Sequence, residues 1–433
     1  MRRFGVAIAG CTAAAVVTLT ALGGTSDRLL PLRSPPLATP HLTAIVTGRH
    51  GSRLVRLDAS SFAVERSSSP VGWFRGWVRS AVGHRVAVAT CPHRCTGTLL
   101  RFANPATLRW EPRGVLLDGQ FYAAAWPRPR TLLALVGGET ALTLVKVDPF
   151  AMRIVASTPV TGPIFQTAHS THGLVLLAGQ EDEVAPARLV VVAPDGRVHS
   201  VQLGRIRAGT RYDRQSRYLL GTTNMPGLAV DPRVGVAYVV DGSGLVAAVR
   251  LGDLSVSYHR LGSGSLLTRL ADWLTPPAQA KDANGPTISA QWLGSGLLAV
   301  AGSDETATAH AGSQRPTGLR IVDTRNWSVR MLDPNANTGW VGDGVLLATG
   351  TSGSYTRNSS HVHREGLVAY GPDGHLRWRL TGVVPFVLGM HGSRAVLAGP
   401  DGFPLVDLAS GHVIRKLPRG PVWDGLLHGA GSP

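Results

Sequence analysis

Residues 367–380 read LVAYGPDGHLRWRL, two β-prone runs on either side of Pro372, Asp373 and Gly374. Proline presets the turn, aspartate caps it, and glycine takes the positive φ that other residues resist. The stretch is therefore a predicted β-hairpin. Because a lone hairpin is only marginally stable in water, these strands must belong to a larger sheet.

The same hairpin recurs along the chain, each time as an apolar run, a turn with Asp, Asn or Gly, and an alternating run. Its eight copies occupy residues 54–68, 99–112, 142–157, 189–203, 245–261, 319–332, 367–380 and 403–417. A mean spacing of about 50 residues is typical of propeller blades. With 52 Gly and 29 Pro in 433 residues, the composition also favours an all-β protein rich in turns.

A nearly continuous apolar run precedes each hairpin, as expected for a strand covered on both faces. Seven of these runs follow one further short segment, whereas the first has none and residues 422–429 are left over at the C-terminus. The repeats predict an all-β fold, an eight-bladed β-propeller over residues 42–433, with the ring closed by the C-terminal strand completing blade 1. Seven blades are the alternative, because one unit could be an insertion.

Residues 1–23 are a predicted targeting segment. Arg2 and Arg3 precede roughly 20 uncharged residues, the layout of a signal peptide, and this run is also long enough to span a bilayer uncut as an N-terminal membrane anchor. Residues 24–41 are rich in proline and predict an extended linker. We therefore expect a secreted or extracytoplasmic protein, either released or anchored to the cytoplasmic membrane by its N-terminal segment.

Cysteine usage predicts one disulfide. Apart from Cys11 in the targeting segment, the chain has only Cys91 and Cys95. In an oxidising compartment two cysteines this close in sequence form a disulfide, which would contribute about 2 kcal/mol. Adding His93 gives three side chains, too few for a closed zinc site, so no metal site is predicted.

The net charge is +16, and nearly all of the cations are arginines scattered along the chain. A GC-rich genome that encodes Arg in place of Lys would explain this charge without a function. Attraction to anionic envelope polymers or lipid head groups would explain it with one. The secretory start argues against nucleic acid, so the expected partner is a protein or an anionic cell-envelope component, and we expect a monomer.

The repeats resemble the YVTN-type and PQQ-like propeller repeats, and the chain resembles secreted propeller proteins of actinobacteria. The resemblance rests on residues 227–244, 367–380 and 405–417 and extends loosely over 42–430. It implies the propeller fold and, through the eight-bladed PQQ-dependent dehydrogenases, a quinoprotein-like oxidoreductase as one enzymatic alternative. The adjacent cysteine pair of those enzymes is missing here, so no cofactor is predicted.

One insertion, residues 204–223, is a candidate anion-binding site. It holds five arginines and two tyrosines within a short span. Guanidinium groups bind phosphate or carboxylate bidentately, so the segment could hold an anion over the mouth of the central channel. The alternative is a solvated loop whose arginines pair with local acids such as Asp213. The candidate residues are Arg205, Arg207, Arg211, Tyr212, Arg214 and Arg217.

The other chemistry-bearing stretches give weaker signals. Residues 262–287 predict a short amphipathic helix, either packed on the ring or docking a partner. His361 and His363 follow the polar stretch TSGSYTRNSS, which predicts a flexible loop. No nucleophile elbow, phosphate loop or calcium loop occurs in the sequence, so no catalytic residue is predicted. We therefore expect a non-catalytic binding module at the cell envelope; the alternative is a propeller enzyme, an oxidoreductase, lyase or hydrolase, with its site in the central channel.

Overall fold

The computed structural model is an all-β protein. It describes residues 30, 32, 41–80, 85–91, 97–138, 141–181, 183–212, 221–261, 286–307, 311–342, 344–356, 359–381, 386–398, 403–417 and 422–427. Within these ranges every regular element is a β-strand, as the sequence predicts.

All eight predicted hairpins are present, each as two antiparallel strands. We call each hairpin with the two strands that lead into it a unit, and name its strands inner, second, third and outer. Unit 1 consists of β35 (Val422–Leu427), β1 (His41–Gly48), β2 (Gly51–Asp58) and β3 (Val64–Ser67). Unit 2 consists of β4 (Trp73–Arg79), β5 (Val86–Cys91), β6 (Gly97–Asn104) and β7 (Arg109–Asp118). Unit 3 consists of β8 (Gln120–Arg128), β9 (Thr131–Gly137), β10 (Ala141–Asp148) and β11 (Arg153–Thr161). Unit 4 consists of β12 (Ile164–Ser170), β13 (Gly173–Ala178), β15 (Ala185–Val192) and β16 (Val198–Tyr212).

The second half of the chain repeats this order. Unit 5 consists of β18 (Gly227–Asp231), β19 (Val236–Val240), β20 (Leu245–Arg250) and β21 (Val256–Arg260). Unit 6 consists of β22 (Thr287–Gly294), β23 (Leu297–Ala307), β25 (Leu319–Asp323) and β26 (Ser328–Asp333). Unit 7 consists of β27 (Thr338–Gly342), β28 (Val345–Thr356), β29 (Ser359–Tyr370) and β30 (Leu376–Leu380). Unit 8 consists of β31 (Phe386–His391), β32 (Arg394–Ala398), β33 (Phe403–Asp407) and β34 (Val413–Leu417). Three further strands lie outside the units: β14 (Gln180–Glu181), β17 (Gly221–Asn224) and β24 (Ala311–Pro316).

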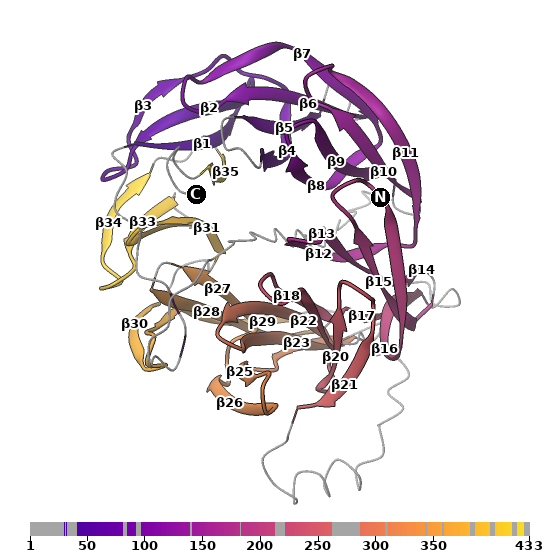
Figure 1. The fold of residues 1–433 in the computed structure, drawn as a ribbon. Helices are drawn as coiled ribbons and strands as arrows, with labels where there is room; N and C mark the ends of the chain where they lie inside the picture. The colour runs from indigo at the N-terminus through magenta and orange to yellow at the C-terminus, as the bar shows by residue number, and fades with distance from the viewer. Residues whose placement is uncertain are drawn as a thin grey trace, which may run out of the picture.

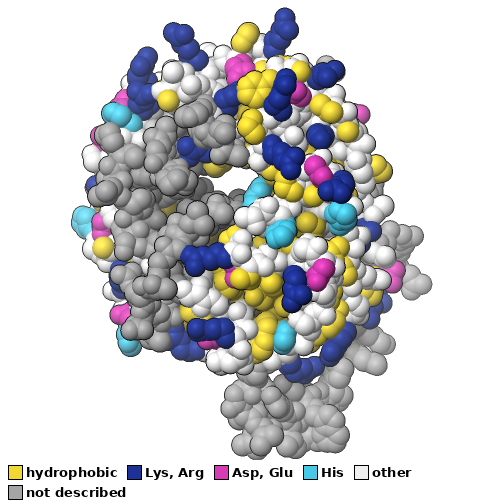
Figure 2. Space-filling model, in the orientation of Figure 1, with side chains coloured by type: hydrophobic (Ala, Val, Ile, Leu, Met, Phe, Trp, Pro, Cys, Tyr) yellow, Lys and Arg dark blue, Asp and Glu magenta, His cyan; other side chains and the backbone are white. Residues whose placement is uncertain are grey.

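The units are arranged in a circle around a central opening (Figure 1). The space-filling view shows the same opening between the two sides of the molecule (Figure 2). Second strands are the most buried: every residue of β5 and β13 is buried, which explains their nearly continuous apolar sequence. Outer strands such as β3 are exposed along their whole length.

The C-terminal strand pairs with the first unit. β35 lies antiparallel to β1, with Trp423 opposite Val46 and Leu426 opposite Ala44. The pairing that the leftover C-terminal segment predicts is therefore present. Side chains of β32, β33 and β34 also form one apolar cluster with side chains of β1 and β2, so unit 8 packs directly on unit 1.

Apolar clusters fill the junctions between neighbouring units. One cluster joins units 2 and 3 through Phe102 and Trp126, whose rings lie edge to face at 5.7 Å. Further clusters join units 1 and 2, 3 and 4, 4 and 5, 5 and 6, 6 and 7, and 7 and 8. Each sheet thus buries both of its faces against neighbours, which a single four-stranded sheet cannot do.

Units 6 and 7 are fused into one nine-stranded sheet. β24 pairs with the end of β23 on one side and with the end of β28 on the other, while β28 continues to pair with β29. The sequence predicts a flexible loop over residues 351–360, and that prediction is wrong. Thr351–Thr356 and Ser359–Arg364 form an antiparallel strand pair instead.

Outer turns share a strained but well-supported geometry. Phe62, four residues after Asp58, has φ +54°, and its N–H donates to the Asp58 carbonyl at 2.8 Å. A left-handed conformation costs a non-glycine residue roughly 1–2 kcal/mol, which burial of the Phe62 ring, 1% exposed, offsets. The equivalent turns place Leu108, Met152, Leu254 and Trp327 at positive φ.

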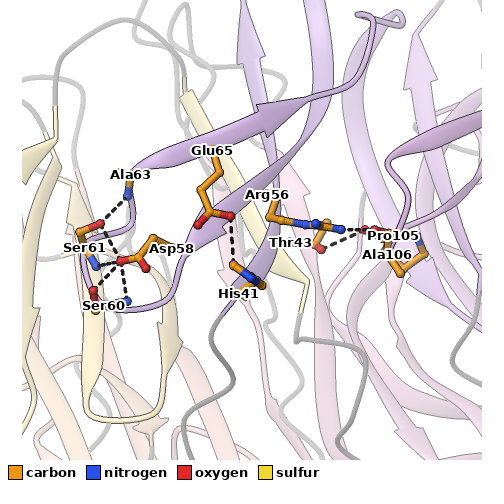
Figure 3. A network of polar contacts seen from close by, with 10 residues as sticks. All are labelled: His41, Thr43, Arg56, Asp58, Ser60, Ser61, Ala63, Glu65, Pro105 and Ala106. Atoms are coloured by element: carbon orange, nitrogen blue, oxygen red, sulfur yellow. Dashed lines mark hydrogen bonds and ion pairs between the residues drawn. The ribbon is translucent and has the colours of Figure 1, made fainter.

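Figure 3 shows how such turns are capped and joined. Hydrogen bonds from the Ser60 and Ser61 hydroxyls to the Asp58 carboxylate lower the pKa of this side chain well below its usual range. On the same strand, Arg56 of unit 1 donates to the Ala106 carbonyl in the outer turn of unit 2. The turns therefore fix the hairpins locally and also tie one unit to the next.

Candidate functional site

Successive antiparallel strands reverse direction, so the connections of each unit alternate between two faces of the molecule. We call turn face the side that carries the inner-to-second and third-to-outer connections. Contacts between such connections confirm the grouping: Arg394 Nη1 donates to the Ala59 carbonyl at 3.1 Å, and Thr171 Oγ1 to the Pro232 carbonyl at 3.3 Å. The opposite side carries β14, β17, β24 and the projecting ends of β16, β23, β28 and β29; we call it the insertion face.

The predicted anion-binding segment lies on the insertion face. Sequence reasoning treats residues 204–223 as a loop, but β16 continues through Tyr212 and pairs with β17 from Gly209↔Asn224 to Tyr212↔Gly221. The alternation Arg205-Ile206-Arg207-Ala208 explains this strand, because Ile206 and Ala208 are fully buried while both arginines are exposed. That alternation was the available signal for a strand.

The position of β16 differs from the expected place over the channel. β16 is the outer strand of its unit, whereas β12 is the inner one. Figure 1 accordingly shows β16 near the rim of the circle. An anion held by the described part of this segment would therefore lie at the rim.

Two arginines of the segment, Arg205 and Arg207, are held by neutral groups. The Arg205 guanidinium lies over the Tyr258 ring, 5.2 Å from its centroid, and the Arg207 Nη2 donates to the Val184 carbonyl at 2.6 Å. Arg211 is exposed opposite Thr222. Among the described residues no carboxylate pairs with any of the three arginines, so their charge is available to a ligand. Arg214, Arg217 and Asp213 lie outside the described residues, as does the side chain of Tyr212.

Gly209 fixes the path of the segment. Its φ is +139°, and a Cβ there would lie 2.0 Å from the Glu183 carbonyl oxygen. We expect Gly209→Ala to separate β16 from β14 and β17, because both the clash and the backbone strain oppose the side chain. Hydrogen exchange at residues 210–212 should then speed up at least tenfold. Gly204→Ala is the matched control, since a Cβ at Gly204 meets nothing within 4 Å; equal exchange in both variants would contradict this role.

A second polar element stands on the same face, where β23, β24, β28 and β29 project. Gln314 Nε2 donates to Glu305 Oε1 at 3.1 Å and to Ser303 Oγ at 3.3 Å. Burial raises the pKa of Glu305, since partial removal from water disfavours its charged form. His363 Nε2 lies 3.1 Å from Glu365 Oε1. Sequence reasoning missed this element, because its residues carry no apolar alternation.

The predicted disulfide and the predicted helix both involve residues outside the described part of the chain. Among the described residues, no group of three or more His, Cys, Asp and Glu side chains is placed to hold a metal ion. Cys91 is buried at the end of β5, but Cys95 lies outside the described residues, so the disulfide stays a prediction. The helix expected within 262–287 lies almost wholly outside them, at 262–285. In the part of the chain that is described, no helix has the length and apolar character to cross a membrane.

No protein-family model matches the sequence, and no curated protein matches it. Solved structures do match. The dihydro-heme d1 dehydrogenase NirN, in complex with DHE, aligns with 92% of this chain and 77% of its own at 13% identity and a TM-score of 0.50. Apo AztD from Citrobacter koseri aligns with 91% of this chain and 100% of its own at 11% identity and a TM-score of 0.51. Both are β-propellers, and at such identities the likeness concerns the fold alone: this chain has the β-propeller fold.

Proposed function

We propose that this chain is an eight-bladed propeller that acts as a binding module for an anionic component of the cell envelope. Each unit is one blade, and the ring closes where β35 completes the first blade. Eight hairpins and the apolar cluster between units 8 and 1 support this count. The module works outside the cytoplasm, either released or held at the membrane by residues 1–23, and binds without catalysing a reaction.

The arginine segment carries the proposal. Arg205, Arg207 and Arg211 are exposed on one projecting strand, and no described carboxylate neutralises them. Guanidinium groups held over a tyrosine ring and by a backbone carbonyl lose less side-chain freedom when a phosphate or carboxylate binds. The ligand class that this arrangement fits is a polymer bearing phosphate or carboxylate groups.

General positive charge is the competing explanation for anion binding. Lys and Arg side chains occur at many places on the described part of the visible side (Figure 2), and the net charge of +16 alone would attract a polyanion. The similarity to NirN, a dehydrogenase, adds no enzymatic argument, because it concerns the fold alone. The test must therefore separate the arginine segment from the net charge of +16.

We expect Arg205→Glu with Arg211→Glu to lower the salt concentration that elutes the protein from immobilised heparin, a general polyanion. The matched control is Arg109→Glu with Arg113→Glu, two exposed positions on β7, which changes the net charge equally. The drop in eluting salt should be at least twice as large for the segment variant. Equal drops would mean that the retention reflects net charge, and the proposed site would be discarded.

A further inference from the structure

The N-terminal linker contributes to the folded core. Leu30 and Leu32 are 0% and 2% exposed, although both belong to the stretch that the sequence predicts to be an extended linker. They lie in the apolar cluster between units 6 and 7, with Leu346 and Tyr370 among its members. The leucines of this proline-rich stretch follow neither the strand nor the helix period. The sequence therefore does not predict that Leu30 and Leu32 are buried in the core.

Polar contacts fix where these leucines sit. The Leu30 N–H donates to the carbonyl of Pro372, which belongs to the third-to-outer turn of unit 7 and hence to the turn face. Next to it the Tyr370 hydroxyl donates to the buried Asp333 carboxylate of unit 6 at 2.8 Å. The chain therefore enters the folded part from the turn face, at the junction of units 6 and 7.

The length of the preceding chain limits where a membrane can lie. Only residues 24–29 separate the apolar run from Leu30, and seven peptide steps span at most about 25 Å. β28 runs from the turn face to the insertion face over 12 residues, a rise of about 36 Å. A bilayer that holds residues 1–23 can thus reach the turn face, whereas the insertion face lies beyond the reach of the connecting chain.

The turn face also exposes apolar side chains at separate places around the circle. Phe150, in the outer turn of unit 3, is 56% exposed, and Val234, between β18 and β19, is 64% exposed. Arg233, next to Val234, is exposed as well. Apolar tips beside a cation suit the interface between lipid head groups and acyl chains.

We infer that the turn face is a membrane-facing surface and that Leu30 and Leu32 set this orientation. The partner is a lipid bilayer, and the arginine segment on the insertion face points away from it. The inference rests on the membrane-held form of the proposed function, and it adds which face meets the lipid.

The test uses the full chain with Cys11→Ala, reconstituted with phosphatidylcholine vesicles, whose zwitterionic lipid has no net negative charge to attract the arginine segment. A fluorophore is attached at Val234→Cys on the turn face or at Val362→Cys, 59% exposed on the insertion face. Nitroxide lipids should quench the first dye at least fivefold more than the second. In a chain that also carries Leu30→Asp and Leu32→Asp, the ratio should fall below twofold while the protein still floats with the vesicles.

Equal quenching at the two positions, or a ratio that survives the two Asp substitutions, would overturn the orientation and leave the proposed anion binding untouched. A full chain that does not float with the vesicles would overturn the membrane-held form, and the orientation with it. The heparin experiment tests the arginine segment separately, so the two failures remain distinguishable.

Discussion

A disulfide between Val46→Cys and Trp423→Cys should form spontaneously and raise the thermal midpoint by about 7 °C. The two residues are directly opposite in the β1–β35 pair, and opposed residues in antiparallel strands have the Cα separation that a disulfide needs. The bond would close a loop of nearly the whole chain, which the chain-entropy estimate values at about 6 kcal/mol. Divided by the unfolding entropy of a domain of this size, that stabilisation gives the expected shift.

The matched control moves one cysteine out of register. Leu427 lies opposite Thr43 and not opposite Val46. The variant with Val46→Cys and Leu427→Cys therefore places its two cysteines at positions that do not face each other. Mass spectrometry after non-reducing digestion should find the cross-link in the first variant and two free thiols in the control. Efficient cross-linking in both, or in neither, would contradict a ring closed by β35 in this register.

Arg85→Ala should destabilise the protein by about 3 kcal/mol. The Arg85 guanidinium donates from Nε and Nη2 to the two Glu111 oxygens, each at 2.7 Å, and lies 5.2 Å from the Phe102 ring centroid. Its Nη2 also donates to the Pro149 carbonyl of unit 3, so one side chain ties units 2 and 3 together. Removing one partner of a buried ion pair costs about 3–5 kcal/mol, and because Arg85 and Glu111 are 17% and 31% exposed we expect a loss at the lower end of that range.

Urea denaturation measures this loss, and two further variants locate its cause. Arg85→Lys keeps the charge but not the planar bidentate geometry, so it should recover less than half of the lost stability. Arg325→Ala is the control, because Arg325 pairs with Asp323 at 2.6 Å within one exposed turn and should cost under about 1 kcal/mol. An Arg85→Ala loss no larger than that of Arg325→Ala would show that the inter-unit bridge does not stabilise the fold.

The repeated core of the fold could be predicted because each unit carries its own turn residues and its own apolar strand. Pro372, Asp373 and Gly374 form the predicted turn, with the Gly374 N–H donating to the Gly371 carbonyl at 2.9 Å and φ +73° at Gly374. Second strands read as apolar runs because both of their faces are covered. The C-terminal segment revealed its partner because one unit lacked a strand.

The candidate site was harder to predict because its strands do not face the core in the same way. On β16, Arg205 and Arg207 suggested a solvated loop, whereas the buried Ile206 and Ala208 that alternate with them place this stretch in a strand. In the projecting pair of β28 and β29 nearly every side chain is polar, so backbone pairing alone decides the conformation. Contacts set by tertiary packing, such as Leu30 against the core, leave no periodic trace in the sequence.

The bridging strand β24 joins units 6 and 7 through backbone hydrogen bonds. Other neighbouring units are joined by apolar packing and by individual hydrogen bonds, such as that from Arg56 to the Ala106 carbonyl. Units 6 and 7 are joined by more contacts than apolar packing alone. β24 pairs with a strand of each unit, and the Leu30 side chain is buried in the cluster between them. We therefore expect units 6 and 7 to move together as one rigid body, so that the projecting polar strands keep their positions relative to each other.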